Sequence, residues 1–160
     1  MASNYGNVRV RYIHGFLENV NDNVNRYLTA RGIEWTNNSS FIVGLSETVV
    51  YSGVNRSLDI GYLNPISSHL EIELNNRQNR LGTDSGNGVW QISIDKMFFG
   101  KIRLSYNYLF DEFILDDQQI RNGKSNGEAF SLRGAYTPMS TSNSMLSIYV
   151  SLVNIGTNTF

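Results

Sequence analysis

Residues 31–65 begin with Arg31-Gly-Ile-Glu34-Trp35, continue through Gly44-Leu-Ser-Glu47-Thr-Val-Val-Tyr51-Ser-Gly53 and end with Gly61-Tyr62-Leu63-Asn64-Pro65. The first two runs alternate between apolar and polar side chains, and they flank a polar segment from Asn37 to Ser40. Alternation with period two is typical of a strand with two different faces. A short run of Asn and Ser favours a tight turn. The stretch therefore predicts a β-hairpin.

Glu47 is the residue of this hairpin that least fits its surroundings, because it shares a strand face with apolar side chains from Val43 to Tyr51. A bare carboxylate in an apolar environment is disfavoured by several kcal/mol. If the hairpin turns about Ser39, residues whose numbers sum to about 78 lie opposite each other, so Arg31 faces Glu47. We expect a structural ion pair, and contact of the two residues with a ligand is the alternative. Either account points this face at protein or at a lumen, not at lipid.

The rest of the chain repeats the period-two pattern. Alternating apolar positions occur in the segments Val8–Tyr12, Tyr27–Trp35, Phe41–Tyr51, Trp90–Ile94, Ile102–Phe110, Phe130–Tyr136 and Leu146–Leu152. Turn residues separate these segments, and the Phe99-Gly100-Lys101 join predicts a tight hairpin. We expect an all-β chain with more than half of its residues in antiparallel strands and no helix longer than about two turns.

Composition limits the class of protein. The chain has 160 residues, enough for one domain with a core, and its charged fraction of 17% is below the roughly 25% usual in soluble domains. The net charge of −1 provides no basic footprint, so nucleic acid is not an expected partner. The sequence contains no run of about 18 apolar residues, so it predicts no membrane-spanning helix. A membrane-spanning strand needs only about 9–11 alternating residues.

The alternation alone does not say where the apolar face points. In a soluble sandwich that face packs on a second sheet, and in an outer-membrane barrel it contacts lipid. Short turns alternate here with long connections such as residues 111–128, which is the arrangement of outer-membrane barrels. The pattern alone does not decide between a soluble sandwich and an outer-membrane barrel.

No residue set in the sequence predicts catalysis or metal binding. Ser46 lies within a predicted strand and lacks the second glycine of a nucleophile elbow. His14 and His69 have no third ligand at a supporting spacing. The acidic residues between Asp111 and Asp117 have the composition of a solvated loop, although a carboxylate pair is also what a glycosidase needs. We therefore expect no enzyme activity, no metal and no cofactor.

Four short motifs carry a resemblance to a known family. They are Arg31-Gly-Ile-Glu34-Trp35, Gly-Leu-Ser-Glu47-x-x-x-Tyr51-x-Gly53, Tyr62-Leu63-Asn64-Pro65 and Tyr106-Asn-Tyr108-Leu-Phe110-Asp111-Glu112-Phe113. In order and spacing they resemble the Wzi capsule-assembly family of bacterial outer-membrane proteins. The resemblance implies a closed outer-membrane β-barrel without catalytic activity that helps hold capsular polysaccharide at the cell surface. The implied partners are capsular or surface polysaccharide and outer-membrane lipid.

The carboxyl end departs from the usual last strand of such a barrel. Asn154, Gly156 and Asn158 occupy the alternate positions before Phe160 at which apolar residues are expected. We therefore expect residues 1–160 to form a single antiparallel outer-membrane β-barrel segment that is incomplete and belongs to a longer chain.

Two sets of polar and aromatic residues are candidate sites. The glycan-binding candidates, chosen as aromatic platforms and planar polar groups at the loop ends of strands, are Trp35, Arg56, Tyr62 and Asn64. If the protein is instead an outer-membrane pore for small solutes, the candidates for its polar lumen are Arg11, Glu34, Arg103 and Asp111. A soluble carbohydrate-binding β-sandwich is the third hypothesis.

Overall fold

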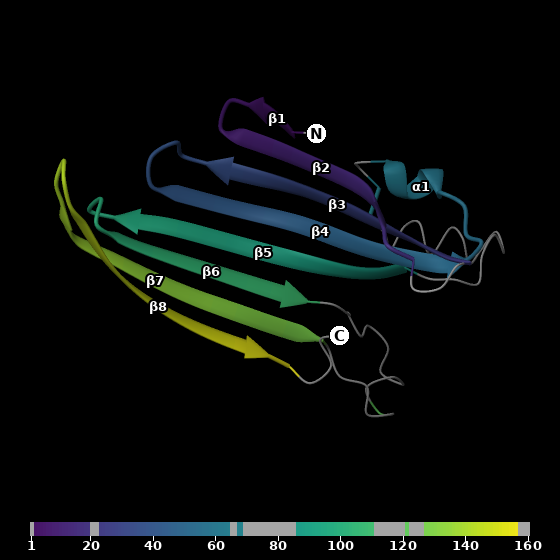
Figure 1. The fold of residues 1–160 in the computed structure, drawn as a ribbon. Coiled ribbons are helices and arrows are strands. Elements are labelled where there is room, and N and C mark those ends of the chain that lie inside the picture. Colours follow the sequence, from purple (N-terminus) through teal and green to yellow (C-terminus); the bar gives the residue numbers. More distant parts are fainter. Residues whose placement is uncertain are drawn as a thin grey trace.

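The computed structural model describes residues 2–19, 23–64, 67–68, 86–110, 121 and 127–156. These residues form one eight-stranded sheet and one short helix (Figure 1). The elements are β1 (Ala2–Tyr5), β2 (Val8–Leu17), β3 (Val24–Thr36), β4 (Phe41–Val54), α1 (Ile60–Leu63), β5 (Gly86–Phe98), β6 (Ile102–Phe110), β7 (Glu128–Ser140) and β8 (Met145–Ile155). The predicted all-β fold is confirmed, with 74% of the described residues in strands.

Each strand pairs antiparallel with its neighbour in sequence, so the spatial order is β1 to β8 without a crossover. The sheet is curved and not closed in the described part of the chain (Figure 1). The two edge strands of the described sheet differ in length: β1 has 4 residues and β8 has 11. Since the described strands form a single sheet, they do not pack as a sandwich of two sheets.

All the short turns lie at one end of the sheet. They connect β1 to β2, β3 to β4, β5 to β6 and β7 to β8, whereas the longer connections leave the opposite end (Figure 1). Below, the two ends are called the turn end and the loop end. In the β3–β4 turn, the Asn37 side chain accepts hydrogen bonds from the backbone N–H groups of Ser39, Ser40 and Phe41. This Asx-type bonding is the local reason that the chain reverses here.

The β5–β6 hairpin is as tight as its sequence predicts. Phe99 and Gly100 have φ values of +52° and +66°, and the Lys101 N–H donates to the Phe98 carbonyl at 3.1 Å. The register pairs Phe98 with Ile102, so residues 99–101 make the turn, and positive φ at Phe99 and Gly100 gives it a twist that suits the flanking strands. Glycine adopts positive φ without strain, whereas Phe99 is a non-glycine residue in the left-handed region.

The strand registers divide the side chains between two faces. Tyr12, Arg31, Glu47 and Trp90 lie in one cross-strand row, so these residues and their alternate neighbours share the first face. We call it the apolar face, because most of its side chains are aliphatic or aromatic. The opposite side, which carries Arg9, Glu34, Asp95 and Arg103 among others, is called the polar face.

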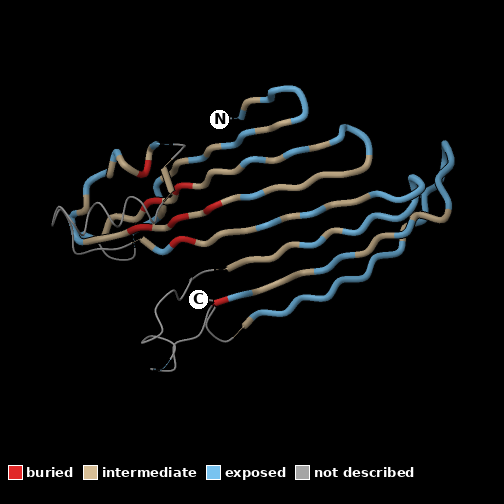
Figure 2. The backbone as a smooth tube through the Cα atoms, turned by 180° about the vertical axis from the view of Figure 1, so that it is seen from behind, coloured by how far each residue is buried: buried red, intermediate tan, exposed pale blue. Residues whose placement is uncertain are grey.

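The buried core lies on the apolar face at the loop end, where α1 folds back over the sheet (Figure 1). Its apolar members are Tyr27, Val49, Tyr51 and Tyr62, and most of the buried positions gather there (Figure 2). The Tyr51 ring stacks between Tyr27 at 4.9 Å and Tyr62 at 4.3 Å. The Asp59 side chain caps α1 by accepting a hydrogen bond from the Gly61 N–H at 2.9 Å. This cap sets the start of the helix at Ile60.

Candidate functional site

The ion pair expected from the hairpin register is present. Arg31 on β3 lies directly opposite Glu47 on β4, and Arg31 Nε is 2.7 Å from Glu47 Oε2. The side chains are 10% and 1% exposed, respectively. A charge pair so enclosed needs both partners, because removal of one leaves an uncompensated charge in a poorly hydrated site.

Protein, not solvent, covers this pair. Arg31 Nη1 donates to the backbone carbonyl of Asn64 at 2.8 Å, and the Tyr12 hydroxyl donates to the carbonyl of Tyr62 at 3.2 Å. Both carbonyls belong to the end of α1, where the last carbonyls of a helix accept hydrogen bonds from groups outside it. The pair and the tyrosine therefore fix the α1 segment over the sheet. The expectation that this face points at protein or at a lumen, not at lipid, holds at the ion pair, because protein covers the face there. It does not extend to the rest of the face, which no protein covers in the described structure.

Arg56 belongs to the same cover but has a different function in it. Its guanidinium lies 4.9 Å from the centre of the Tyr51 ring. Its backbone carbonyl accepts hydrogen bonds from Asn25 Nδ2 and the Tyr27 hydroxyl, both at 2.8 Å. These contacts place Arg56 as a cation over an aromatic ring and as an anchor for the chain that leaves β4.

Beyond α1, toward the turn end, the apolar face is uncovered in the described structure. Large apolar side chains there are exposed on every strand from β2 to β8, and we call them the apolar belt. Its members are Val10, Ile33, Trp35, Leu45, Ile92, Ile94, Phe98, Ile102, Leu104, Tyr106, Leu132, Tyr136, Ile148, Val150 and Leu152. A contiguous exposed apolar surface across seven strands marks an interaction surface, since soluble monomers rarely expose one.

Lys96 lies on the apolar face near the turn end. Its long side chain is apolar along the stem and charged at the tip. Its ammonium donates to Ser40 Oγ at 3.2 Å, in the β3–β4 turn. It also lies 5.6 Å from the Phe41 ring and 5.9 Å from the Phe98 ring. The aliphatic stem thus lies along the apolar face while the charge reaches the polar turn, which is the behaviour called snorkelling.

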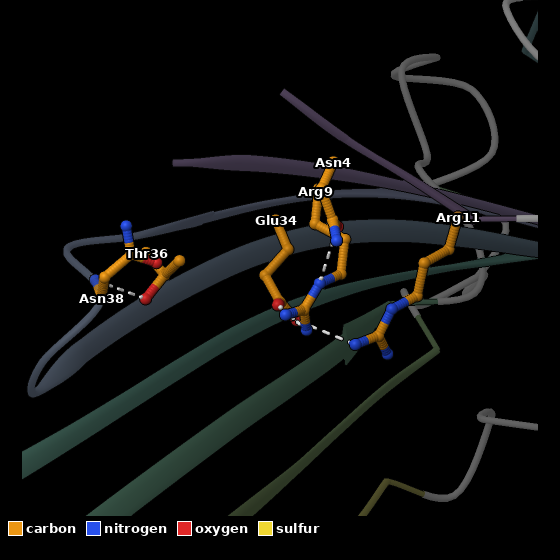
Figure 3. Close-up of polar contacts among 6 residues, drawn as sticks. All are labelled: Asn4, Arg9, Arg11, Glu34, Thr36 and Asn38. Atoms are coloured by element: carbon orange, nitrogen blue, oxygen red, sulfur yellow. Dashed lines mark hydrogen bonds and ion pairs between the residues drawn. The ribbon is translucent and has the colours of Figure 1, made fainter. Parts of the chain in front are cut away.

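The polar face carries networks of charged and amide groups. Arg9 Nη1 lies 2.9 Å from Glu34 Oε1, and Arg11 Nη2 lies 3.8 Å from the other oxygen of the same carboxylate (Figure 3). Two cations therefore share one acid. Toward the other edge, Asp95 accepts from Arg103 Nε at 2.8 Å and from Ser105 Oγ at 2.6 Å. Arginine exceeds acid on this face of the described strands.

The glycan-binding candidates do not form one site. Trp35 is exposed near the turn end, whereas Arg56, Tyr62 and Asn64 lie at the loop end. The sequence predicts Tyr62 as an aromatic platform for a glycan, and this is wrong because its ring is fully buried against Tyr51. Asn64 is exposed, and its amide donates to Ser67 Oγ at 2.8 Å.

Three of the four lumen candidates share one face of the sheet. Arg11, Glu34 and Arg103 all lie on the polar face, Arg11 and Glu34 in contact and Arg103 several strands away. Asp111 lies outside the described residues. The residues that sequence reasoning missed on this face are Arg133, Tyr149 and Ser151, which line a hollow near β8. Arg133 carries a detectable signal, because it is a charge within the alternating run from Phe130 to Tyr136.

The described ranges contain neither a metal-ligand cluster nor a helix able to cross a membrane. No group of three or more His, Cys, Asp or Glu residues there is placed to hold a metal ion. His14 Nδ1 instead lies 2.8 Å from Thr29 Oγ1, and His69 is outside the described residues. Among the described elements, no helix has the length and apolar character needed to cross a membrane.

Comparison of the chain with protein-family models, with curated proteins and with solved structures finds no match. The likeness to the Wzi family therefore rests on the four sequence motifs.

Proposed function

We propose that this chain is a segment of a non-enzymatic bacterial outer-membrane protein that helps attach capsular or surface polysaccharide to the cell. The observation that carries the proposal is the division of the sheet into an apolar belt on one face and an arginine-rich polar network on the other. A strand sheet between lipid and water needs such a division. The polysaccharide is implied by the sequence resemblance.

Strand length and connections support the membrane part of the proposal. Strands β2 to β8 have between 9 and 14 residues, and a tilted strand of about 9–11 residues spans the hydrocarbon core of a bilayer. Short turns at one end and longer connections at the other are the arrangement of outer-membrane proteins. On this proposal the turn end faces the periplasm and the loop end faces outward.

The buried ion pair is compatible with a lipid-facing belt because the apolar face is divided along its length. Arg31 and Glu47 lie under the α1 segment, while the belt begins in the next row toward the turn end, with Ile33 and Leu45. On this proposal lipid meets only the belt. Lys96 would then place its charge at the periplasmic boundary, where a snorkelling lysine is tolerated.

The membrane part is tested by the fluorescence of the two tryptophans in vesicles that contain lipids brominated on the acyl chain. Trp35 belongs to the exposed belt, whereas Trp90 is less exposed and lies in the row of the covered ion pair. In single-tryptophan variants, Trp35 emission should be strongly quenched and Trp90 emission much less. Equal and weak quenching of both would argue against a lipid-facing belt.

The attachment part is tested in cells. Deletion of the gene should release polysaccharide into the medium while the total amount made stays constant, because attachment and synthesis are separate steps. A fall in total polysaccharide, or cleavage of glycan by the purified protein, would contradict attachment.

A pore for small solutes is the second candidate, and the polar network of Arg9, Arg11 and Glu34 favours it because charged rings line such channels. Conductance of the reconstituted protein in planar bilayers separates the two functions.

A further inference from the structure

The polar face between β6 and β8 contains a hollow of about 440 Å³, lined by Arg103, Ser105, Arg133, Tyr149 and Ser151 among others. We call it the β6–β8 hollow. The register explains its shape. Arg103, Ala135 and Tyr149 form one cross-strand row, so the small Ala135 lies between two large side chains. Ser105, Arg133 and Ser151 form the adjacent row.

Arg133 is the charged group of the hollow that the protein leaves available. It is exposed, and in the described part of the chain it has neither an ion pair nor a hydrogen bond to its side chain. Arg103 differs, because both oxygens of Asp95 accept from its Nε, at 3.0 and 2.8 Å. The hollow thus contains one engaged and one available guanidinium.

The excess positive charge of the polar face indicates that a ligand there is negatively charged. In the described strands this face has the cations Arg9, Arg11, Arg26, Arg103 and Arg133 and the acids Glu34 and Asp95. The chain as a whole has a net charge of −1, so the positive excess is a property of this face. Both acids are already bound by arginine, so among the described strand residues of this face an anion meets no uncompensated acid.

Tyr149 adds an apolar platform beside the cation. It is 75% exposed, and it is the diagonal neighbour of Arg133 across β7 and β8, a spacing of about 7–8 Å between backbones. This distance is suited to a sugar ring that lies against the tyrosine while a carboxylate on the ring reaches the guanidinium. Arginine binds carboxylates through two parallel hydrogen bonds, and the serines on both sides supply hydroxyl groups.

From these observations we propose that the β6–β8 hollow binds a carboxylate-bearing sugar unit of an acidic polysaccharide, with Arg133 as the carboxylate ligand and Tyr149 as the ring platform. The proposal rests on the proposed function and deepens it, because it states the chemical class of polysaccharide that is held.

The test measures binding of trigalacturonate to the full chain in detergent micelles by calorimetry, with the carboxyl-reduced trisaccharide as the neutral probe. The wild type should bind the acidic probe and bind the neutral one at least tenfold more weakly, because a hydrogen bond between charged groups is lost. Binding should weaken as salt rises, since the site is open to solvent.

Variants locate the site. Arg133→Gln should reduce affinity for trigalacturonate about tenfold or more. Arg26→Gln is the matched control, because it removes the same charge from the same face outside the hollow, and it should change affinity less than twofold. Arg133 is exposed, so its replacement should leave the circular-dichroism spectrum unchanged and an affinity loss is not a folding loss.

Each outcome decides a separate point. Equal affinity for acidic and neutral probes would overturn the proposed ligand class and leave the attachment function standing. Equal losses in Arg133→Gln and Arg26→Gln would overturn the hollow as the site. If the wild type bound neither these probes nor any polysaccharide extracted from the host surface, both the inference and the proposed function would be wrong.

Discussion

Arg31 and Glu47 face each other across β3 and β4, with Arg31 Nε 2.7 Å from Glu47 Oε2 and both side chains almost fully enclosed. The pair lies on the apolar face of the sheet, where neither charge is tolerated alone. The carbonyl of Asn64 accepts a further hydrogen bond from Arg31. The pair therefore joins two strands and the α1 segment, and its loss should affect all three.

The first prediction is a double-mutant cycle on this pair. Glu47→Ala should lower the free energy of unfolding by about 3–5 kcal/mol, because it leaves an uncompensated buried arginine. Adding Arg31→Ala should recover part of that loss. Urea unfolding of the folded protein in micelles measures both. The control is Asp95 with Arg103, a more exposed pair whose coupling should be about 0–1 kcal/mol. Additive effects at Arg31 and Glu47 would contradict the coupling.

The second prediction concerns the cover formed by α1. Tyr62→Ala should destabilise the protein by about 3–5 kcal/mol, because the buried ring leaves a cavity beside Tyr51. Ile60→Ala on the same helix is the control, since Ile60 is 78% exposed, and it should cost less than about 0.5 kcal/mol. Unfolding midpoints report both changes. Similar small costs would mean that α1 is not packed on the sheet in solution.

The third prediction tests which face meets lipid. Leu132 lies in the apolar belt, and the adjacent Ser131 lies on the polar face of the same strand. In lipid vesicles, Leu132→Arg should reduce stability by about 2–4 kcal/mol, the cost of an arginine at mid-membrane. Ser131→Arg should cost about 1 kcal/mol or less, because its side chain meets water. A larger cost at Ser131 would reverse the assignment of the faces.

The fourth prediction concerns the edge strand β8. Residues 145–155 contain no charge, no proline and no glycine, and nearly every position is exposed. Such an edge is a template for pairing with another strand. In detergent-poor buffer, Val153→Lys should reduce self-association, because a charge on an edge opposes pairing. Phe99→Lys is the control, because Phe99 is 93% exposed but lies in the β5–β6 turn, away from the free edge of β8. Sedimentation velocity measures association, and equal effects of the two changes would exclude β8 as the contact.

Much of this architecture was accessible from the sequence, because the signals are local. Alternation from Phe41 to Tyr51 and from Ile102 to Phe110 indicates strands and assigns their faces. Asn37 and Gly100 mark tight turns through their own backbone preferences. Once a turn is placed, period two determines the register, so the contact between Arg31 and Glu47 follows from counting residues.

The position of the loop segments was not accessible in this way. Tyr62 has the composition of an exposed platform, yet it is buried against Tyr51. Trp35 and Asn64 belong to the same stretch of sequence, residues 31–65, but lie toward opposite ends of the sheet, because the chain between them runs the length of β4. No local pattern encodes these placements. They depend on contacts that form only when the sheet exists.

Sequence alone therefore determined the strands, the turns, the separation of apolar from polar side chains and one ion pair, since each depends on neighbours a few residues apart or on a single hairpin. Tertiary structure alone decided that α1 covers the ion pair, that the belt is exposed in the described part of the chain, and that Arg133 and Tyr149 share a hollow across β7 and β8. The physical reason is range. Backbone preference and periodicity act locally, whereas burial and the assembly of a site depend on which distant segments pack together.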